Sequence, residues 1–319
     1  MTQFDVTTFG ESLLRLSVPV GRPLELTSQL DLNIAGSESN VLAILAQLGH
    51  RCSWASSLPD TALGRLAANQ FRLRGIDLSN VVWRENGRIG NYFVEMVAPP
   101  RVIQVIYDRE NSCVTQMAPA EVEWDALLDT QLIHLSGITP ALSAGCHEIV
   151  KTAVAKAHAD NIPVSFDVNY RSKLWSTNEA AESLLPLMQN TEILFCAIRD
   201  AELLYGISGT PEEVIEQLAE LTQAKHVVVS VGAEGVFGWN GDRFIRQSAY
   251  ETTIIDALGA GDALAAGVIN GWLSDDFARG LQMGAALAAM ALSQVGDMVV
   301  VTPSALNDLL VKGQRKVQR

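Results

Sequence analysis

The sequence predicts an α/β fold: a doubly wound, mostly parallel sheet flanked by helices and partly covered by a small β-sheet lid. Short β-rich runs alternate with helical patterns through the middle and C-terminal parts, as in parallel sheets. Extended segments within residues 10–35 and 88–113 break this rhythm, and we assign them to the lid. With 319 residues and 48% apolar content, the chain suits one domain over residues 1–319 with a substantial core.

The N-terminal third contains the first core strand and the predicted lid. Phe4–Phe9 is β-rich, and Leu24–Ile34 looks extended, without helical periodicity. Gly90–Val97 and Arg101–Tyr107 are β-rich runs joined around Pro99-Pro100, which predicts a hairpin. A small sheet of this kind that covers a site would act as a lid.

The rest of the chain supplies the other elements of the main sheet and its helices. The β-rich runs are Leu132–Leu135, Pro163–Val168, Ile193–Cys196 and Val227–Val231. The helical patterns are Ser143–Asp160, Glu179–Met188, Arg199–Tyr205, a helix capped by Thr210 that runs through Leu221, and Gly280–Ser293. Gly235–Trp239 and Phe244–Gln247 flank the tight turn Asn240-Gly241, which predicts a hairpin at the sheet edge.

The segment Asp256-Ala257-Leu258-Gly259-Ala260-Gly261-Asp262 lies between a β-rich run, Ala249–Ile255, and a helical pattern, Ala263–Leu273. Two glycines that open a helix leave backbone N–H groups unpaired at its positive end, where phosphate binds. A carboxylate there would be repelled unless it had another task, such as accepting the proton of an attacking hydroxyl. The turn therefore predicts phosphoryl transfer to an alcohol. The alternative is an ordinary helix start, with Asp262 placed for the helix dipole.

Other phosphate-binding motifs and several classes of partner are disfavoured. No Gly-Lys pair occurs, so there is no P-loop, and Gly10-Glu11-Ser12 after the first strand is not a dinucleotide-binding turn. A net charge of −13 disfavours nucleic acid and anionic membranes as partners. No segment reaches the roughly 18–20 apolar residues of a membrane span, and the N-terminus lacks signal-peptide features. The four cysteines are widely spaced, which indicates reduced thiols in a cytoplasmic protein.

Three segments stand in a familiar order: Ala35-Gly36-Ser37-Glu38-Ser39-Asn40-Val41 with Leu45–Gly49 after it, then Pro59-Asp60-x-x-Leu63-Gly64, then Asp256–Asp262. Together they resemble the signatures of the ribokinase-like (pfkB) sugar kinases, and the similarity covers roughly residues 4–310. The resemblance implies the same α/β fold with a lid, with ATP and Mg²⁺ as cofactors and a monovalent cation as a further option. It also implies a homodimer, because exposed lid edges favour pairing with a second copy.

Within the family, four stretches resemble 2-keto-3-deoxygluconate kinases: Gly10–Ser17, Tyr107–Ser112, His134–Leu142 and Phe166–Arg171. The expected function is ATP-dependent phosphorylation of that keto-sugar acid or a related one. Two alternatives stay open, namely a fructokinase-like kinase of a neutral sugar and a catalytically weak sugar- or nucleotide-binding protein. A nicotinamide oxidoreductase ranks below both, because the glycine fingerprint is missing.

The resemblance implies roles for the residues of the segment Asp256–Asp262. Asp262 would be the general base that deprotonates a primary hydroxyl of the sugar. Gly259, Ala260 and Gly261 would present backbone N–H groups to the transferring phosphoryl group. Arg109 and Arg171 are predicted to bind a substrate carboxylate, which a guanidinium recognises with charge-assisted hydrogen bonds. The alternative for this pair is two surface arginines.

The remaining candidates have weaker support. Asn40 and Asn169 suit either substrate class, and Gly36 would let the sugar approach the backbone or simply serve a turn. Tyr92 and Tyr107 would contact the sugar from the lid strands or pack within the lid. Gly232 and Gly235 match the loop beneath the nucleotide in the family, or are hairpin glycines. Asp200 is the predicted metal residue, in a segment, Ala197-Ile198-Arg199-Asp200, that departs from the usual N-x-x-E motif.

Overall fold

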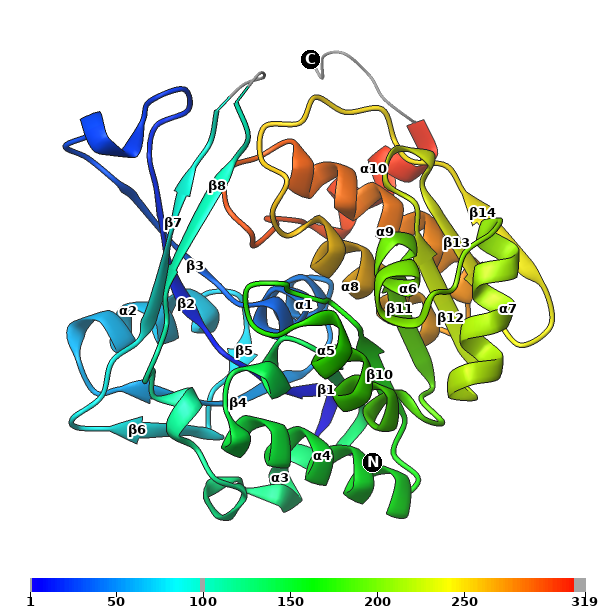
Figure 1. Cartoon of the computed structure of the whole chain (residues 1–319), viewed down its shortest axis with the longest axis horizontal. Coiled ribbons are helices and arrows are strands. Elements are labelled where there is room, and N and C mark those ends of the chain that lie inside the picture. Colours follow the sequence, from blue (N-terminus) through cyan, green and yellow to red (C-terminus); the bar gives the residue numbers. More distant parts are fainter. Residues whose placement is uncertain (1, 98–100, 313–319) are drawn as a thin grey trace.

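The strands of the main sheet alternate with helices along most of the chain in the computed structural model, which describes residues 2–97 and 101–312 (Figure 1). The strands are β1 (Phe4–Phe9), β4 (Cys52–Pro59), β5 (Ile76–Asp77), β6 (Val81–Arg84), β9 (Thr130–Ser136), β10 (Val164–Asp167), β11 (Ile193–Ala197), β12 (His226–Ser230), β13 (Val236–Trp239) and β14 (Phe244–Gln247). Their order in space is β14-β13-β12-β11-β10-β9-β1-β4-β5, with β6 beside β4. All pairings from β12 to β5 are parallel, as is that of β6 with β4, and only the β12–β13–β14 edge is antiparallel.

Helices cover both faces of this sheet. They are α1 (Ser37–Gln47), α2 (Ala62–Arg72), α3 (Trp124–Leu128), α4 (Ala144–Ala159), α5 (Thr177–Leu184), α6 (Ile198–Tyr205), α7 (Pro211–Thr222), α8 (Ala260–Trp272), α9 (Phe277–Leu292) and α10 (Pro303–Lys312). Side chains alternate along each strand, so β11 sends Ile193 and Phe195 into one core and Leu194 and Cys196 into the other. Helices α1, α2, α8, α9 and α10 pack in the first core and α3–α7 in the second, which confirms the doubly wound prediction.

Local signals in the sequence explain where the helices begin and how two of them pack. Thr210 forms a capping box with Glu213 in front of Pro211, and α7 begins there as predicted. Helices α8 and α9 approach so closely that a Cβ on Gly267 would lie 2.2 Å from the backbone nitrogen of Gly284. The alanines and glycines of these helices therefore fix the position of α8, whose N-terminus carries the predicted phosphate-binding turn.

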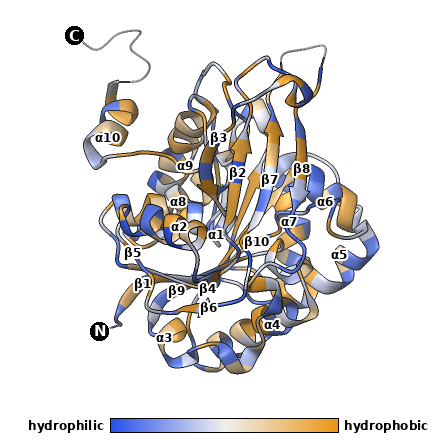
Figure 2. Cartoon of the chain, turned by 90° about the vertical axis from the view of Figure 1, so that its left-hand side faces the viewer, coloured by the Kyte–Doolittle hydropathy of each residue, from blue (hydrophilic) through white to orange (hydrophobic). Residues whose placement is uncertain are grey.

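The predicted lid is a separate sheet at the left of Figure 1. Its strands are β2 (Leu13–Ser17), β3 (Asp31–Ala35), β7 (Gly90–Glu95) and β8 (Gln104–Asp108), in the order β3-β2-β7-β8. The outer pairs are antiparallel, whereas β2 and β7 are parallel. Figure 2 views the lid from outside, with the main sheet and its helices beyond it.

Three predictions about local structure need correction or fall outside the description. Leu24–Ile34 is not one extended run, because Leu24–Leu26 form a 3₁₀ turn and β3 begins only at Asp31. Ala249–Ile255 is not a strand. Ile254 and Ile255 are exposed, and the Ile255 N–H bonds to the carbonyl of Leu292 rather than to a neighbouring strand. The predicted hairpin turn at Pro99-Pro100 lies outside the described residues.

Candidate active site

A cavity of about 190 Å³ lies where the lid meets the ends of α1 and α8. The predicted catalytic and substrate-binding residues all line it: Gly36, Asn40, Tyr92, Tyr107, Arg109, Asn169, Arg171, Gly259, Ala260, Gly261 and Asp262. They come from the lid, from the start of α1, from the loop after β10 and from the start of α8. The fold thus brings together segments that are more than 200 residues apart in the chain.

Asp262 is buried and held by two side chains from the first turns of α1. Its Oδ1 accepts a hydrogen bond from Ser37 Oγ at 2.7 Å, and its Oδ2 accepts one from Asn40 Nδ2 at 2.7 Å. Burial raises the pKa of Asp262 to about 6, and the two hydrogen bonds limit this rise. At neutral pH the carboxylate is therefore mostly ionised and close to the range in which a general base works best.

The turn before Asp262 combines a tightly packed glycine with an open one at the start of α8. Gly259 is the N-cap of α8 with a φ of 84°, and a Cβ there would lie 2.4 Å from the carbonyl oxygen of Asp297. Only glycine fits this position. A Cβ on Gly261, in contrast, would meet nothing within 4 Å, so the backbone at this residue faces open space. Helix α8 begins at Ala260, three residues earlier than the sequence pattern predicts.

Ser37 links Asp262 to the loop after β10. Asn169 Nδ2 donates to Ser37 Oγ at 2.8 Å, and the same hydroxyl donates to Asp262. Asn169 has a φ of 41°, and its backbone N–H bonds to the side chain of Asp167 at 3.1 Å. Gly36 lines the cavity, but a Cβ there would lie 2.2 Å from the carbonyl oxygen of Glu11, so packing alone requires the glycine.

The two predicted carboxylate-binding arginines have different surroundings. Arg109 is largely buried, and it forms an ion pair with Glu11, with its Nε 2.8 Å from Glu11 Oε2. Ser112 donates to the other oxygen of Glu11. Arg171 is exposed and, among the described residues, forms no ion pair; its Nη1 donates to the Tyr170 carbonyl at 3.1 Å. Both arginines line the cavity, but in the described part of the chain only Arg109 has a carboxylate within ion-pair distance; Arg171 acts on Asp167, Asp200 and Asp262 through its charge and limits the rise that burial causes in the pKa of each.

The lid tyrosines also differ. Tyr92 is buried, and its hydroxyl donates to Asp297 at 2.9 Å and 3.0 Å, which favours a lid–core contact. Tyr107 is 38% exposed and lies 5.5 Å from Tyr92, measured between ring centroids. The Arg109 guanidinium lies 5.3 Å from the Tyr107 ring centroid. Tyr107 therefore offers its ring to the cavity, whereas the hydroxyl of Tyr92 is already bonded.

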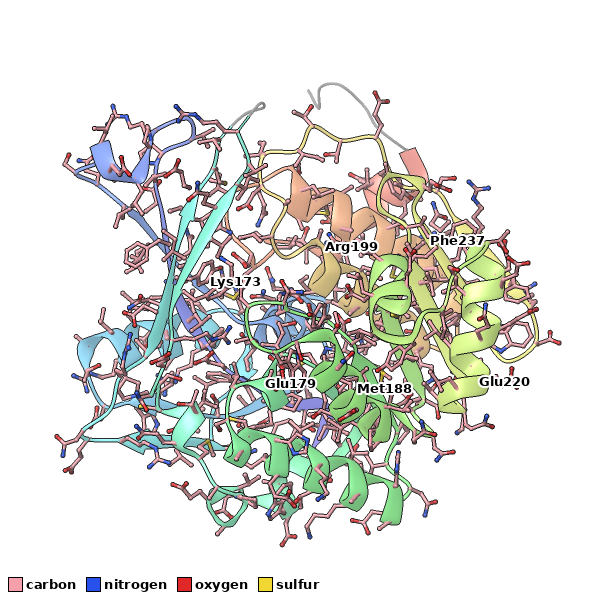
Figure 3. The ribbon with its side chains drawn as sticks, in the orientation of Figure 1. Lys173, Glu179, Met188, Arg199, Glu220 and Phe237 are labelled. Atoms are coloured by element: carbon pink, nitrogen blue, oxygen red, sulfur yellow. The ribbon has the colours of Figure 1, made fainter. Side chains whose placement is uncertain are left out.

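A larger cleft of about 1240 Å³ continues from this cavity between β8 and the loop after β10. Tyr107, Arg109 and Arg171 line both spaces. The basic side chains at the cleft are Arg88, Arg109, Arg171, Lys173 and Arg199, against three acidic ones; Lys173 and Arg199 are labelled in Figure 3. A chain with a net charge of −13 thus presents cations where an anionic ligand would enter.

A second small cavity, of about 190 Å³, lies on the other side of the turn and includes Gly261 and two carboxylates, Asp167 and Asp200. Burial raises the pKa of Asp167 to about 7, and the nearby Asp262 and Asp200 carboxylates add to the rise. Burial also raises the pKa of Asp200. Among the described residues, no group of three or more His, Cys, Asp or Glu side chains is placed to hold a metal. Two carboxylates nevertheless suit Mg²⁺, which takes most of its ligands from water and phosphate.

The predicted nucleotide-loop glycines lie in the 3₁₀ turn between β12 and β13 and line neither cavity. Gly235 has a φ of 114°, and a Cβ there would lie 2.1 Å from the Gln247 carbonyl oxygen, so the hairpin itself requires this glycine. A Cβ on Gly232 would meet nothing within 4 Å. Gly232 is exposed, so its role beneath the nucleotide stays a prediction.

Several polar residues around the cavity were not predicted to act there. Glu38 is fully buried; its Oε1 accepts from Ser136 Oγ at 2.7 Å and from Thr139 Oγ1 at 2.5 Å. Burial raises its pKa to about 7. Glu11, Ser37 and Asp297 also line the cavity. The first three of these four residues stand inside or beside the sequence motifs, so their position in the motif was the available signal.

The fold and the site define a kinase that phosphorylates a small hydroxyl compound. Residues 3–304 match the model of the pfkB family carbohydrate kinases, and the chain belongs to this family. It is 34% identical to a 2-dehydro-3-deoxygalactonokinase of Haloferax volcanii, with 99% of each chain covered. It is 31% identical to a 2-dehydro-3-deoxygluconokinase of Thermoproteus tenax, with 92% of this chain and 89% of the relative covered.

The solved structures agree. The crystal structure of a 2-dehydro-3-deoxygluconokinase from Thermotoga maritima superposes with a TM-score of 0.92 at 30% identity, covering 97% of this chain and 99% of the other. The predicted fold and enzyme class are thereby confirmed: the protein is a carbohydrate kinase, a phosphotransferase with an alcohol acceptor. No described helix combines the length and apolarity needed to cross a membrane.

Proposed function

We propose that the protein transfers the γ-phosphoryl group of ATP to a hydroxyl of 2-keto-3-deoxygluconate or of a closely related keto-sugar acid. One observation carries this proposal: a buried carboxylate, an anion-binding turn and two arginines line the same small cavity. The named relatives act on 2-dehydro-3-deoxy sugar acids of the gluco and galacto series, which differ in configuration at one carbon.

Asp262 would accept the proton of the attacking hydroxyl as the oxygen bonds to phosphorus. The substrate hydroxyl has to approach a carboxylate that already accepts from Ser37 and Asn40, so these two residues fix the direction of the remaining lone pairs. Gly259, Ala260 and Gly261 would direct backbone N–H groups at the transferring phosphoryl. Loss of one such donor costs roughly 3–4 kcal/mol in the transition state of comparable sites.

The substrate carboxylate would bind chiefly to Arg171, with Arg109 as second cation. Arg109 already has Glu11 as its partner, so it would share its guanidinium between the protein and the substrate. Tyr107 would cover the sugar from the lid, and Asn169 would bond to a hydroxyl. Closure of the lid over this cavity would exclude water and limit wasteful ATP hydrolysis.

ATP would lie with its phosphates at the turn and its base toward the loop that contains Gly232 and Gly235. Asp200 would hold Mg²⁺ with Asp167, because two hard oxygen ligands beside the turn match the preferences of that ion. When bound, magnesium neutralises charge on the β- and γ-phosphates. A monovalent cation stays a prediction, which activity in potassium, sodium and choline buffers would test.

A neutral ketose is the second candidate acceptor. The ion pair between Arg109 and Glu11 favours it, since a neutral sugar would leave this pair intact. The deciding experiment measures the release of ADP from Mg·ATP in the presence of each candidate acceptor. The acceptors are 2-keto-3-deoxygluconate, its galacto epimer, fructose and ribose, with a reaction without acceptor as the blank. We expect turnover with one or both sugar acids. Faster turnover with fructose or ribose would contradict the assignment of the two arginines.

The lid would pair with the lid of a second copy. Leu32, Leu16, Phe93 and Ile106 lie directly opposite one another across its four strands, on the face away from Arg15 and Tyr92. Leu32 is 42% and Ile106 49% exposed, and Figure 2 shows the lid strands to which the row belongs. A homodimer would bury the row, so Ile106→Glu should shift the mass measured by light scattering from dimer to monomer. A wild-type monomer at micromolar concentration would contradict this.

A further inference from the structure

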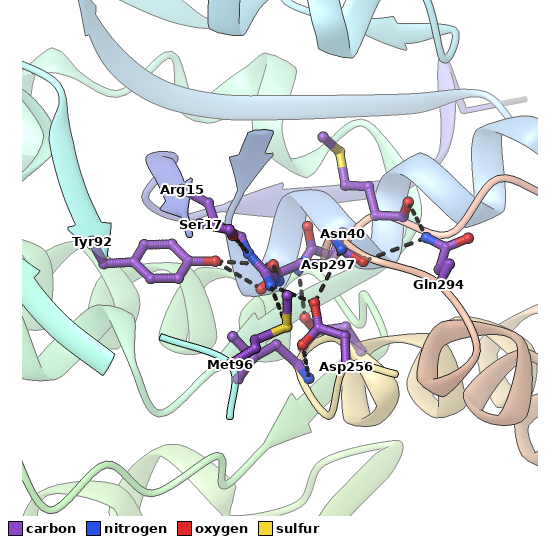
Figure 4. A network of polar contacts seen from close by, with 12 residues as sticks. Arg15, Ser17, Asn40, Tyr92, Met96, Asp256, Gln294 and Asp297 are labelled. Atoms are coloured by element: carbon purple, nitrogen blue, oxygen red, sulfur yellow. Dashed lines mark hydrogen bonds and ion pairs between the residues drawn. The ribbon is translucent and has the colours of Figure 1, made fainter. Parts of the chain in front are cut away.

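Arg15, in lid strand β2, is an arginine with no exposed side-chain surface. Its guanidinium forms ion pairs with Asp256 and, at 2.5 Å, with Asp297, and its Nε donates to Ser17 Oγ at 2.9 Å (Figure 4). The two carboxylates come from different loops, one immediately before α8 and one after α9. A buried charge is tolerated in a protein only when it is paired in this way, so the three side chains form one unit.

The same carboxylates hold the backbone around the anion-binding turn. Asp256 Oδ1 accepts from the Leu258 N–H at 3.1 Å, and its Oδ2 accepts from the Gly296 N–H at 3.1 Å. The backbone of Asp297 packs against Gly259, where a Cβ would lie 2.4 Å from its carbonyl oxygen. The Arg15 ion pairs therefore lie directly behind the residues proposed to bind the transferring phosphoryl group.

The lid contributes a second contact to this unit. The Tyr92 hydroxyl on β7 donates to both oxygens of Asp297, and Met96 Sδ lies 3.8 Å from Arg15 Nη2. The lid strands β2 and β7 thus reach the turn through charged and polar side chains rather than through the sugar cavity alone. Burial raises the pKa of Asp297, whereas Arg15 and the Tyr92 hydrogen bond hold that pKa down.

Without Arg15, two buried carboxylates would face the back of a site that has to bind a polyanion. With it, the three charged groups carry a net charge of −1 instead of −2. Asp297 lines the cavity beside Gly259, Ala260 and Gly261, so its charge acts at short range on phosphates bound at the turn. Because ATP carries several negative charges and a sugar acid carries one, the identity of residue 15 should affect the binding of ATP more strongly than the binding of the sugar.

We propose that Arg15 is a positioning residue: a built-in counter-cation that holds the turn Ala257–Gly261 in its phosphate-binding shape and connects this turn to the lid. The proposal rests on the assignment of the turn to ATP phosphate. Arg15 lies in the stretch Gly10–Ser17 that resembles the related kinases, but it is not among the predicted site residues. Its effect would operate through Asp256 and Asp297, since Arg15 itself does not line the cavity.

The test measures the Kd of Mg·ATP by titration calorimetry and, in parallel, kcat and KM for both substrates. We expect Arg15→Met to weaken ATP binding by at least tenfold and to lower kcat/KM for ATP by at least 100-fold. Sugar binding should change by less than threefold. Arg74→Met is the matched control, because Arg74 is a partly buried arginine that bonds to Gln70 and lines neither cavity. It should leave all constants near the wild-type values.

A charge-matched variant covers the case in which Arg15→Met does not fold. The double variant Arg15→Met with Asp297→Asn retains only Asp256, so its net charge of −1 equals that of the wild type. We expect it to fold and to bind ATP at least fivefold more tightly than the single variant, or, if the single variant is unfolded, within tenfold of the wild type. The proposal would be overturned if Arg15→Met bound ATP with wild-type affinity. It would also be overturned if the folded double variant bound ATP as weakly as Arg15→Met, or more than tenfold more weakly than the wild type.

Methylguanidinium gives an independent readout. In Arg15→Ala, millimolar methylguanidinium chloride should raise kcat/KM for ATP at least fivefold above the value of the variant alone. Equal concentrations of methylammonium should raise it less. No rescue in a folded variant would count against the proposal. ATP binding is measured without an acceptor, so a wild type that binds ATP but phosphorylates no sugar would refute the proposed function while leaving this test intact.

Discussion

Ser37 Oγ donates a 2.7 Å hydrogen bond to Asp262 Oδ1 and accepts one of 2.8 Å from Asn169 Nδ2. The hydroxyl thus connects the start of α1 with the loop after β10 and with the start of α8. Together with Asn40, this one small side chain orients the proposed base and lowers its proton affinity, which burial raises.

Removing that hydroxyl should move the acid limb of the pH profile. The base works when ionised, so wild-type kcat/KM should fall as the pH drops through about 6, the pKa of buried Asp262. The Ser37 hydrogen bond favours the carboxylate, so Ser37→Ala should raise this midpoint and lower activity at pH 7 by roughly 10-fold. The pH profile of kcat/KM measures both effects. Ser39→Ala is the control, because the Ser39 hydroxyl donates to the Gly36 carbonyl and not to Asp262. An unmoved midpoint in Ser37→Ala would contradict this role.

Glu38 should make the folded protein less stable as the pH rises. Its carboxyl keeps its proton up to about pH 7 in the folded state, against 4.5 when unfolded, so the folded state binds more protons between these values. Glu38 should therefore lower the free energy of unfolding by roughly 2–4 kcal/mol between pH 4.5 and 7.5, and Asp167, whose pKa is also raised to about 7, should add a fall of its own. Urea unfolding across this range measures the fall, and Glu38→Gln should flatten it. An unchanged slope in that variant would show that Glu38 is ionised in the folded state.

Arg171 should discriminate between acidic and neutral acceptors. Its guanidinium lines the cavity and forms no ion pair at contact distance with a described carboxylate, so Arg171→Met should raise the KM of a sugar acid by roughly 10- to 100-fold. The KM of a neutral sugar should rise much less. Arg72→Met, which removes an exposed arginine at the end of α2, is the control. Equal losses for both kinds of acceptor would instead assign Arg171 to the nucleotide phosphates.

The carboxylate pair beside the turn should set the magnesium requirement. Asp200→Asn and Asp167→Asn each remove one hard oxygen charge from the second cavity, so each should raise the Mg²⁺ concentration for half-maximal activity by about tenfold. Titrations of magnesium at saturating ATP measure this change. Asp60→Asn, an exposed carboxylate paired with Arg65, should leave the titration unchanged. A lower maximal rate with the same magnesium midpoint would contradict the assignment.

Much of the fold follows from local patterns in the chain. Apolar runs such as Val227–Val231 and caps such as Thr210 indicate the local structure within a few residues. The bounds predicted from these two signals lie within one residue of those of β12 and α7. The prediction of β structure at Ala249–Ile255 was wrong, because β propensity does not show whether a neighbouring strand is available for pairing. The lid was predictable as extended segments, but its parallel β2–β7 pairing was not, since that contact joins distant parts of the chain.

The site likewise contains residues that could be predicted from the sequence and residues that could not. The turn Gly259–Asp262 carries its chemistry in four consecutive residues, so it was accessible from sequence. The partners of these groups were not: Glu11 on Arg109, Asp297 on Tyr92 and Arg15 on both loop carboxylates are contacts between residues about 100 to 280 positions apart. Such pairs depend on tertiary packing, which has no local periodicity to reveal it.

The most direct test compares ADP release by wild type and Asp262→Asn with Mg·ATP and 2-keto-3-deoxygluconate or its galacto epimer. Asparagine retains the shape of the side chain and one acceptor oxygen, but its amide NH2 can accept neither the second hydrogen bond nor the proton. The account predicts acceptor-dependent turnover in the wild type and a kcat lower by about 10²–10⁴-fold in Asp262→Asn, with ATP and sugar still bound. A variant that retains more than a tenth of the wild-type kcat would contradict the assignment of Asp262 as the base.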